Sequence, residues 1–159
     1  MFNIFKRKKK VELKSPFEGR AVEITEVPDE VFSSRLVGDG LAFEPNDGTI
    51  YSPVDGEIVQ VFPSKHAIGI KTEEGLDVLI HVGVDTVNMK GEGFESFVSA
   101  GDKVNAGDKL MCFDINLIKE KAKSIVSPLI ITNPETVESM KFFYGDAHRN
   151  STVAVITLK

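Results

Sequence analysis

The sequence has no tryptophan and only one cysteine, Cys112, among its 159 residues. A single cysteine excludes an internal disulfide, which is typical of proteins kept in a reducing cytoplasm. Cys112 lies in the apolar run LMCF, so we expect a small buried core residue rather than a reactive thiol. The chain also lacks an apolar run long enough to span a bilayer. These absences predict one cytoplasmic domain with an ordinary hydrophobic core.

Basic residues are outnumbered, 19 against 24 acidic ones, and the formal net charge is −5. This balance argues against a nucleic-acid partner. The first ten residues, MFNIFKRKKK, are the exception, and we expect residues 1–14 to form a basic tail ahead of a single domain at 15–159. Apolar residues beside these cations could contact an anionic membrane surface; a disordered, solvated tail is the simpler interpretation.

Long amphipathic helical patterns are missing as well, and β-branched apolar runs take their place. Turn pairs such as Asp55-Gly56 and Gly101-Asp102 separate these runs. Many short strands with regular turns predict an all-β protein, an antiparallel sandwich or barrel. Brief helical turns are expected from Pro28 toward Leu36, over 117–123 and from Pro134. The predicted strands are 21–27, 57–62, 67–71, 78–84 and 152–158.

Two ten-residue segments of the chain resemble each other. Residues 15–24 and 52–61 share the pattern S-P-x-acid-G-x-x-V-x-aliphatic. Residues 100–104 and 106–110 form a second, shorter repeat, for which chance similarity is an open alternative. The longer repeat predicts a duplicated strand–turn–strand unit whose two copies bury their faces together.

Two of the three histidines, His66 and His81, flank the turn at 72–75 and predict a hairpin. An even-length loop centred on Glu74-Gly75 has Ile68 facing His81, and one shifted by one residue toward the N-terminus pairs His66 with His81 directly. Such a loop would place both imidazoles on one sheet face, with Cβ atoms roughly 5 to 8 Å apart. An odd loop would place them on opposite faces. His148 lies among turn residues and is expected to be a solvated loop histidine.

A pair of imidazoles in apolar surroundings suits three kinds of chemistry. Neutral imidazole has a pKa near ~6.5 and is nucleophilic at pH 7, so one ring could take a phosphoryl group while the other donates a hydrogen bond to its oxygens. Two imidazoles also make half of a zinc site, to which Asp85 could add a third ligand. Metal-dependent hydrolysis is discounted because the chain lacks an H-x-H element.

Ordered motifs over most of the chain carry a family resemblance. On them and on the two histidines, the sequence is identified as a member of the glucose-type enzyme IIA family of the bacterial phosphoenolpyruvate-dependent sugar phosphotransferase system. The resemblance implies an antiparallel β-sandwich with jelly-roll and Greek-key features, built on a duplicated hybrid motif. It also implies a shallow apolar depression around both histidines and no required cofactor. The matching segments are 27–32, 37–40, 52–56, 79–87, 90–94 and 122–124, with His66-Ala67 between them.

The resemblance also implies a role for individual residues. His81 would take a phosphoryl group on Nε2 from the phosphohistidine carrier HPr and pass it to a cysteine of a sugar-specific, glucose-type enzyme IIB domain. His66 would support that group, with the Ser64 hydroxyl nearby. Enteric members share a zinc ion between the two histidines and a regulatory partner, so His66 and His81 are also the candidate metal ligands. The implied partner-binding rim consists of Asp29, Asp85, Val31, Phe32, Val37, Phe62 and Leu79.

Two other functions compete with this interpretation. The segment SPVDGEIVQV and the pair Met89-Lys90 are similar to features of biotinyl and lipoyl carrier modules. Those modules are about half this length and lack the two-histidine hairpin. A regulatory binding protein without transfer activity is a further alternative, which the presence of both histidines argues against.

Overall fold

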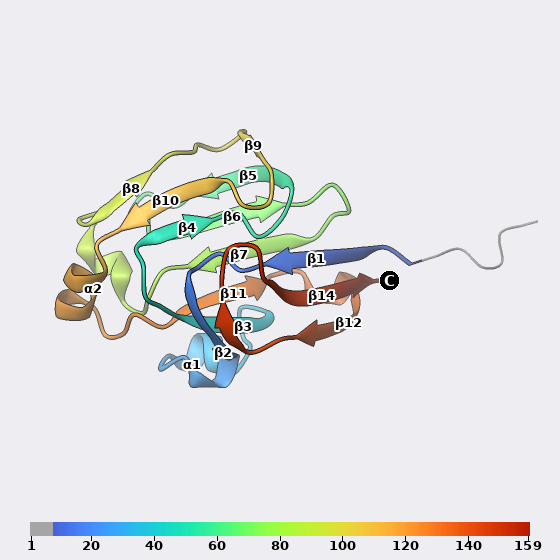
Figure 1. Ribbon diagram of the computed structural model, residues 1–159, viewed down its shortest axis with the longest axis horizontal. Helices are drawn as coiled ribbons and strands as arrows, with labels where there is room; N and C mark the ends of the chain where they lie inside the picture. The colour runs from blue at the N-terminus through green and yellow to red at the C-terminus, as the bar shows by residue number, and fades with distance from the viewer. Residues whose placement is uncertain (1–7) are drawn as a thin grey trace, which may run out of the picture.

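Antiparallel strands make up most of the regular structure in the computed structural model, which describes residues 8–159 (Figure 1). The largest sheet has the order β13-β2-β3-β11-β7-β6-β5-β9. Its strands are β2 (Gly19–Glu23), β3 (Asp39–Pro45), β5 (Gly56–Val61), β6 (Ala67–Lys71), β7 (Asp77–His81), β9 (Lys103–Val104), β11 (Ser127–Ile131) and β13 (Gly145–Ala147).

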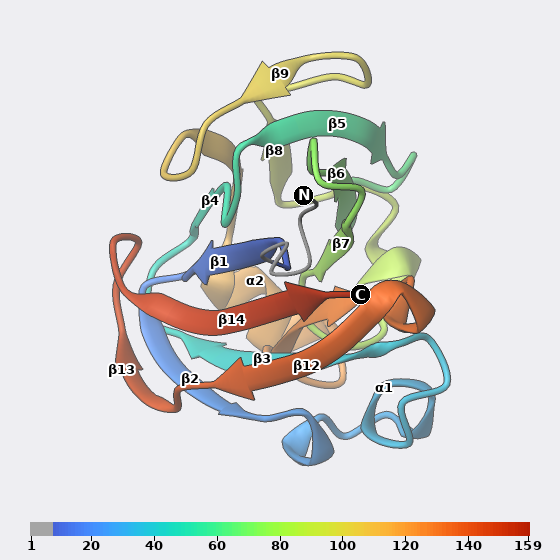
Figure 2. The ribbon, with the colours of Figure 1, turned by 90° about the vertical axis from the view of Figure 1, so that its right-hand side faces the viewer.

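Two three-stranded sheets complete the sandwich (Figure 2). One has the order β1-β14-β12 and the other β4-β10-β8, and no sheet among the described residues closes into a barrel. The antiparallel all-β prediction is confirmed. The strands are β1 (Lys10–Lys14), β4 (Thr49–Tyr51), β8 (Phe94–Ser96), β10 (Lys109–Phe113), β12 (Val137–Phe142) and β14 (Thr152–Leu158).

The helical segments are short, as predicted, and the two α-helices begin at capping residues. The Asp29 carboxylate accepts from the backbone N–H of Val31 at 3.0 Å, and Asp114 accepts from Leu117 in the same way. None of these helices among residues 8–159 is long and apolar enough to cross a membrane. They are α1 (Glu30–Ser33), α2 (Ile115–Lys121) and the 3₁₀ turns η1 (Ile24–Glu26), η2 (Thr86–Met89) and η3 (Pro134–Thr136).

Strand boundaries follow local backbone chemistry. β6 and β14 match their predicted ranges residue for residue. The strand predicted at 78–84 ends at His81, because Gly83 has a φ of +65°, which a strand does not tolerate. The strand predicted at 21–27 ends at Glu23, where η1 begins.

The two copies of the longer repeat pair with each other. The N–H of Lys14 donates to the carbonyl of Pro53 at 2.9 Å, and the N–H of Tyr51 donates to the carbonyl of Pro16 at 2.9 Å. These reciprocal bonds join the Ser-Pro turns that precede β2 and β5. The beginnings of the two copies therefore lie side by side.

Buried side chains form two clusters on opposite faces of the large sheet. Alternation along β3 divides them, since Leu41 and Phe43 belong to the main core while Ala42 belongs to the second cluster. This second cluster lies where α1 and η1 pack beside β2 and β3 (Figure 1). Its buried members are Val22, Ile24, Val27, Phe32, Ala42, Val84 and Ile130.

Two expectations need correction. The folded domain does not begin at residue 15, because residues 10–14 form β1, whose Val11 and Leu13 are buried in the main core. Lys8 and Lys9 are exposed, while the rest of the predicted tail, residues 1–7, lies outside the described residues, as does any membrane contact through it. Cys112 is only half-buried on β10 rather than fully enclosed.

Candidate functional site

The hairpin that carries the two histidines has an odd loop, so the predicted register is wrong. Ala67, not Ile68, faces His81, and Lys71 faces Asp77, which leaves residues 72–76 as the loop. The N–H of Thr72 donates to the Leu76 carbonyl at 3.0 Å, and the Thr72 hydroxyl accepts from the N–H of Leu76 at 3.0 Å. These bonds close a five-residue turn that the sequence pattern did not reveal.

The two imidazoles nevertheless lie side by side, with ring centroids 5.1 Å apart and planes at 74°. Strand alternation does not apply to His66, because β6 begins one residue later. Lys65 has a φ of +56°, and its N–H donates to the carbonyl of Phe62 at 2.7 Å. A tight turn therefore brings the His66 ring to the His81 side of the sheet, where strand geometry alone would have separated them.

Phenylalanines extend this pair into a row of four rings. The Phe32 ring from α1 lies 4.9 Å from His81, and the Phe62 ring lies 5.5 Å from His66. His66 is 7% exposed and His81 is half-buried. Phe32 and His66 are buried in this row, whereas Phe62 and His81 are half-buried, so His81 retains access to solvent beside apolar neighbours.

The His81 ring is held by a backbone carbonyl. Its Nδ1 lies 2.8 Å from the Gly83 oxygen, which can only accept, so Nδ1 carries the proton and Nε2 keeps its lone pair. Burial lowers the pKa of His81 to about 4, against the opposing effect of the Gly83 bond. The ring is therefore neutral at pH 7, and its free nitrogen is a nucleophile.

His66 is neutral for the same reason, because burial lowers its pKa. Its Nδ1 is enclosed and has no hydrogen-bond partner among the described residues. A buried acceptor without a partner is more common in proteins than a buried N–H without one. The enclosure therefore favours a ring protonated on Nε2.

The depressed pKa of His81 predicts an unusual titration. We expect its ring resonances to titrate near pH 4 by NMR, well below the ordinary value of ~6.5. Because the folded pKa lies below the unfolded one, the unfolded chain binds more protons in this window. The contribution of His81 to stability is therefore complete above about pH 6.5 and is lost as the pH falls toward 4.

Denaturant unfolding between pH 7 and pH 4 checks this linkage. In His81→Gln, whose side chain does not titrate, we expect a shallower decline of the free energy of unfolding. An NMR midpoint for His81 near pH 6.5 contradicts the assignment of a desolvated, neutral ring.

Gly83 and Ser127 belong to the site, although sequence reasoning did not single them out. The φ of Gly83 is +65°, and a Cβ there would lie 2.7 Å from the Ser124 oxygen. Its N–H donates to the Ser127 hydroxyl at 2.9 Å. A His-x-Gly sequence at the end of a strand could have indicated that Gly83 belongs to the site, but this short pattern is too common to be specific. Nothing in the sequence links Ser127 to Gly83.

The predicted rim residues differ in how exposed they are. Val31 is 46% exposed on α1, and Asp29 lies close enough for its charge to oppose the fall in the His81 pKa. Val37 and Leu79 are half-buried against the second cluster. Asp85 is exposed in the left-handed region, at a φ of +64°, directly before η2.

The remaining predicted positions contribute less to the geometry. Ser64 is half-buried in the loop before His66, and its hydroxyl forms no hydrogen bond with either ring in the described part of the chain. His148 is exposed and lies 3.3 Å from a Glu18 carboxylate oxygen, as expected for a solvated loop residue.

The histidine pair supplies only part of a metal site. No cluster of three or more histidine, cysteine, aspartate or glutamate side chains suited to a metal occurs within residues 8–159. Two neutral imidazoles 5.1 Å apart could supply half of a tetrahedral zinc shell, but His66 would do so only with its proton moved from Nε2 to Nδ1. The other ligands would have to come from another molecule.

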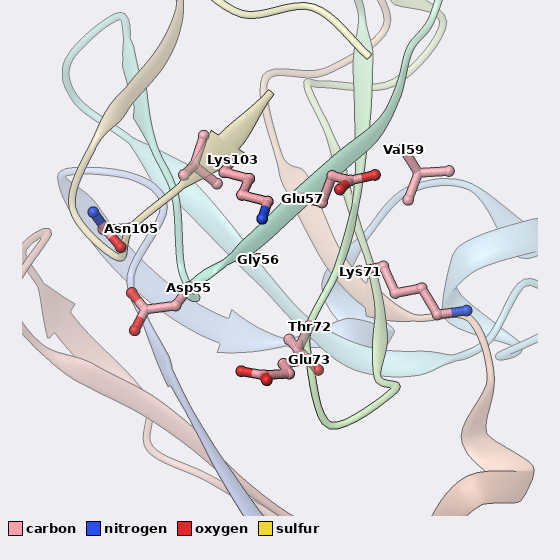
Figure 3. Close-up of a pocket in the computed structure, with 10 residues that line it drawn as sticks. Asp55, Gly56, Glu57, Val59, Lys71, Thr72, Glu73, Lys103 and Asn105 are labelled. Carbon is pink, nitrogen blue, oxygen red and sulfur yellow. The ribbon is translucent and has the colours of Figure 1, made fainter. Parts of the chain in front are cut away.

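A second hollow, of about 530 Å³, lies at the far end of the same hairpin (Figure 3). Two of its charged groups have partners: Asp55 accepts from the N–H of Ala106, and Lys71 pairs with Asp77 at 3.8 Å. In Figure 3 the Lys71 side chain extends away from Asp55 and Asn105. No histidine or cysteine among the described residues lines this hollow, so it offers no nucleophile comparable to the histidine pair.

Comparisons with known proteins agree with the geometry. Residues 11–137 match the family described as phosphoenolpyruvate-dependent sugar phosphotransferase system, EIIA 1. The glucose-specific EIIA component of Bacillus cereus is 52% identical over 91% of this chain and 89% of its own length, and that of Staphylococcus aureus is 43% identical over 87% and 84%. The solved glucose permease IIA of Mycoplasma capricolum is 40% identical, with a TM-score of 0.87 over 98% of this chain and 99% of its own. The chain therefore belongs to the EIIA 1 family of the sugar phosphotransferase system.

Proposed function

We propose that His81 accepts a phosphoryl group on Nε2 from phosphorylated HPr and passes it to a cysteine of an enzyme IIB domain. One observation carries this proposal. The Gly83 carbonyl holds the proton on Nδ1 and leaves Nε2 of a half-buried, neutral ring unprotonated. Family membership supports phosphoryl transfer in general, and the geometry supports this nitrogen in particular.

The transfer step balances without moving the Nδ1 proton. The Nε2 lone pair attacks phosphorus while the phosphorus–nitrogen bond of the donor histidine breaks, and the donor ring leaves with that electron pair as neutral imidazole. His81 then carries both the phosphoryl group and the Nδ1 proton, so its ring is positively charged. The Gly83 carbonyl stabilises this charge more than it stabilises the neutral ring.

Onward transfer reverses the roles. A thiolate of the acceptor attacks phosphorus, the bond to Nε2 breaks, and His81 leaves as the neutral imidazole that burial favours. The same desolvation that lowers the pKa of the free ring therefore keeps the phosphorylated ring reactive. His66, protonated on Nε2, would donate to the phosphoryl oxygens and offset their charge.

The surroundings suit brief encounters with two different proteins. An exposed Val31 and the half-buried Phe62 offer apolar contact, while Asp29 and Asp85 offer charges for basic partners. The relatives are named glucose-specific components, so we propose that the acceptor is a glucose-type enzyme IIB domain. A zinc ion shared with a regulatory partner would use the same two imidazoles.

The carrier-module alternative does not fit the structure. Lys90 follows the 3₁₀ turn η2 in the left-handed region, at a φ of +53°, and Met89 before it is buried in the main core. A lysine that carries biotin or lipoate needs an exposed hairpin tip, and η2 is not one.

Incubation with phosphoenolpyruvate, enzyme I and HPr tests the proposed function. We expect one acid-labile phosphoryl group per chain, in the peptide that contains His81, with nuclear magnetic resonance placing it on Nε2. Omitting HPr should prevent labelling. A label on a serine or on His148, or a biotin or lipoyl adduct by mass spectrometry, would refute the assignment.

A further inference from the structure

Ser127, at the start of β11, is fully buried and forms two hydrogen bonds. Its hydroxyl donates to the carbonyl of Ile125 at 2.8 Å and accepts from the N–H of Gly83 at 2.9 Å. The second bond joins β11 to the segment that follows β7, 44 residues away in the sequence. Within residues 8–159, the Ser127 hydroxyl forms no hydrogen bond with either imidazole, yet it binds the residue whose carbonyl holds His81.

Both peptide groups of Gly83 are anchored to the segment 124–127. The peptide before Gly83 donates its N–H to Ser127, and the peptide after it donates the N–H of Val84 to the Ser124 carbonyl at 2.9 Å. Glycine has the widest choice of backbone angles, so an unanchored Gly83 could rotate out of its φ of +65°. The orientation of its carbonyl thus depends on these anchors.

We propose that Ser127 is a positioning residue for phosphoryl transfer: by holding the N–H of Gly83, it fixes the φ of this glycine and thereby the carbonyl that selects the His81 tautomer whose Nε2 is the nucleophile. The proposal rests on the proposed function of His81. The hydroxyl acts through two links, from Ser127 to the Gly83 backbone and from the Gly83 carbonyl to Nδ1.

Removal of the hydroxyl would leave the Gly83 N–H buried without an acceptor, a state that proteins avoid. Rotation of the Val82–Gly83 peptide would relieve it and would change the φ of Gly83. The next peptide, whose carbonyl bonds to Nδ1, would shift with that change. His81 would then populate the Nε2-protonated tautomer, which has no lone pair at the reacting nitrogen. Removal of the Ser127 hydroxyl should therefore change the tautomer and reactivity of the His81 ring as well as the stability of the fold.

Ser52 offers a matched control for the general effect of losing a buried hydroxyl. It is also fully buried, and its hydroxyl also donates to a backbone carbonyl two residues away, that of Val54 at 2.6 Å. It lies in the Ser-Pro turn before β5, away from the His81 ring. Ser52→Ala thus tests whether any buried serine would give the same result.

The experiment compares Ser127→Ala, Ser127→Cys and Ser52→Ala with the unchanged protein. Nitrogen-15 shifts of the His81 ring at pH 7 report the tautomer before any phosphorylation, and labelling by phosphorylated HPr gives the acceptance rate. In Ser127→Ala we expect a mixture of tautomers and a rate lower by about 10- to 100-fold, the usual cost of losing a group that orients a functional histidine. Ser127→Cys fills the same space with a weaker partner and should fall between. Ser52→Ala should keep both the tautomer and the rate.

The proposal is overturned if Ser127→Ala or Ser127→Cys retains the Nδ1-protonated ring and the full rate, or if Ser52→Ala loses as much. If Ser127→Ala does not fold, Ser127→Cys decides by its ring shifts alone. The two hypotheses separate cleanly: an unlabelled His81 in the unchanged protein defeats the proposed function, whereas unchanged ring shifts in the Ser127 variants defeat the positioning role.

Discussion

We expect replacement of His81 with alanine to abolish phosphoryl acceptance from HPr, a fall of at least about 10⁴-fold, because no other group within residues 8–159 is placed to take over the nucleophile's part. His66 lies 5.1 Å away, but the enclosure of its Nδ1 favours protonation of Nε2, so its outward nitrogen has no lone pair. The half-buried ring can be removed while the main core remains intact, so the variant should fold. Quench-flow labelling with phosphorylated HPr measures the loss.

His148→Ala is the matched control for this prediction. Its ring is solvent-exposed, where a histidine is most easily labelled by accident, and it lies near Glu18 rather than near the aromatic row. We expect labelling at the full rate and extent. Label that persists in His81→Ala, or that disappears in His148→Ala, would place the acceptor elsewhere.

The proximity of the two histidines was predicted from the sequence, but for a reason that the structure does not support. The prediction relied on an even loop and strand alternation, whereas the loop is odd and Ala67 faces His81. The left-handed Lys65 restores the proximity by a turn before β6. Lysine gives no warning of a positive φ, so a pattern of apolar and polar residues cannot reveal this turn.

Strands and helix starts were more accessible to prediction than contacts. The apolar run of β6 and the turn pairs around it are local, and so is the capping carboxylate of Asp29. The bond between Gly83 and Ser127 joins residues 44 positions apart, through a hydroxyl that could equally face solvent. Only the pairing of β11 with β7 places that hydroxyl under the glycine. The family resemblance supplied the roles of the histidines, but no pattern in the sequence shows how they are held.

Replacing His66 with alanine has the second large effect, and it should divide the two halves of the reaction. Acceptance persists, because a neutral imidazole attacks the phosphoryl group and the Nε2 of His81 stays available. Transfer to the enzyme IIB cysteine should fall by about 10²- to 10³-fold, the typical cost of losing a donor to developing negative charge. In that step an anionic thiolate approaches an anionic phosphoryl group, so the N–H of His66 is needed to offset their repulsion.

A two-stage assay checks this division: the variant is first labelled by HPr, purified, and then mixed with an enzyme IIB domain. His66→Gln is the matched control, because its amide N–H₂ can still donate and should recover part of the onward rate. Both variants should keep the His81 ring on its Nδ1 tautomer, since the Gly83 bond does not involve His66. Equal losses in acceptance and in onward transfer would show instead that His66 only shapes the aromatic row through its contact with Phe62.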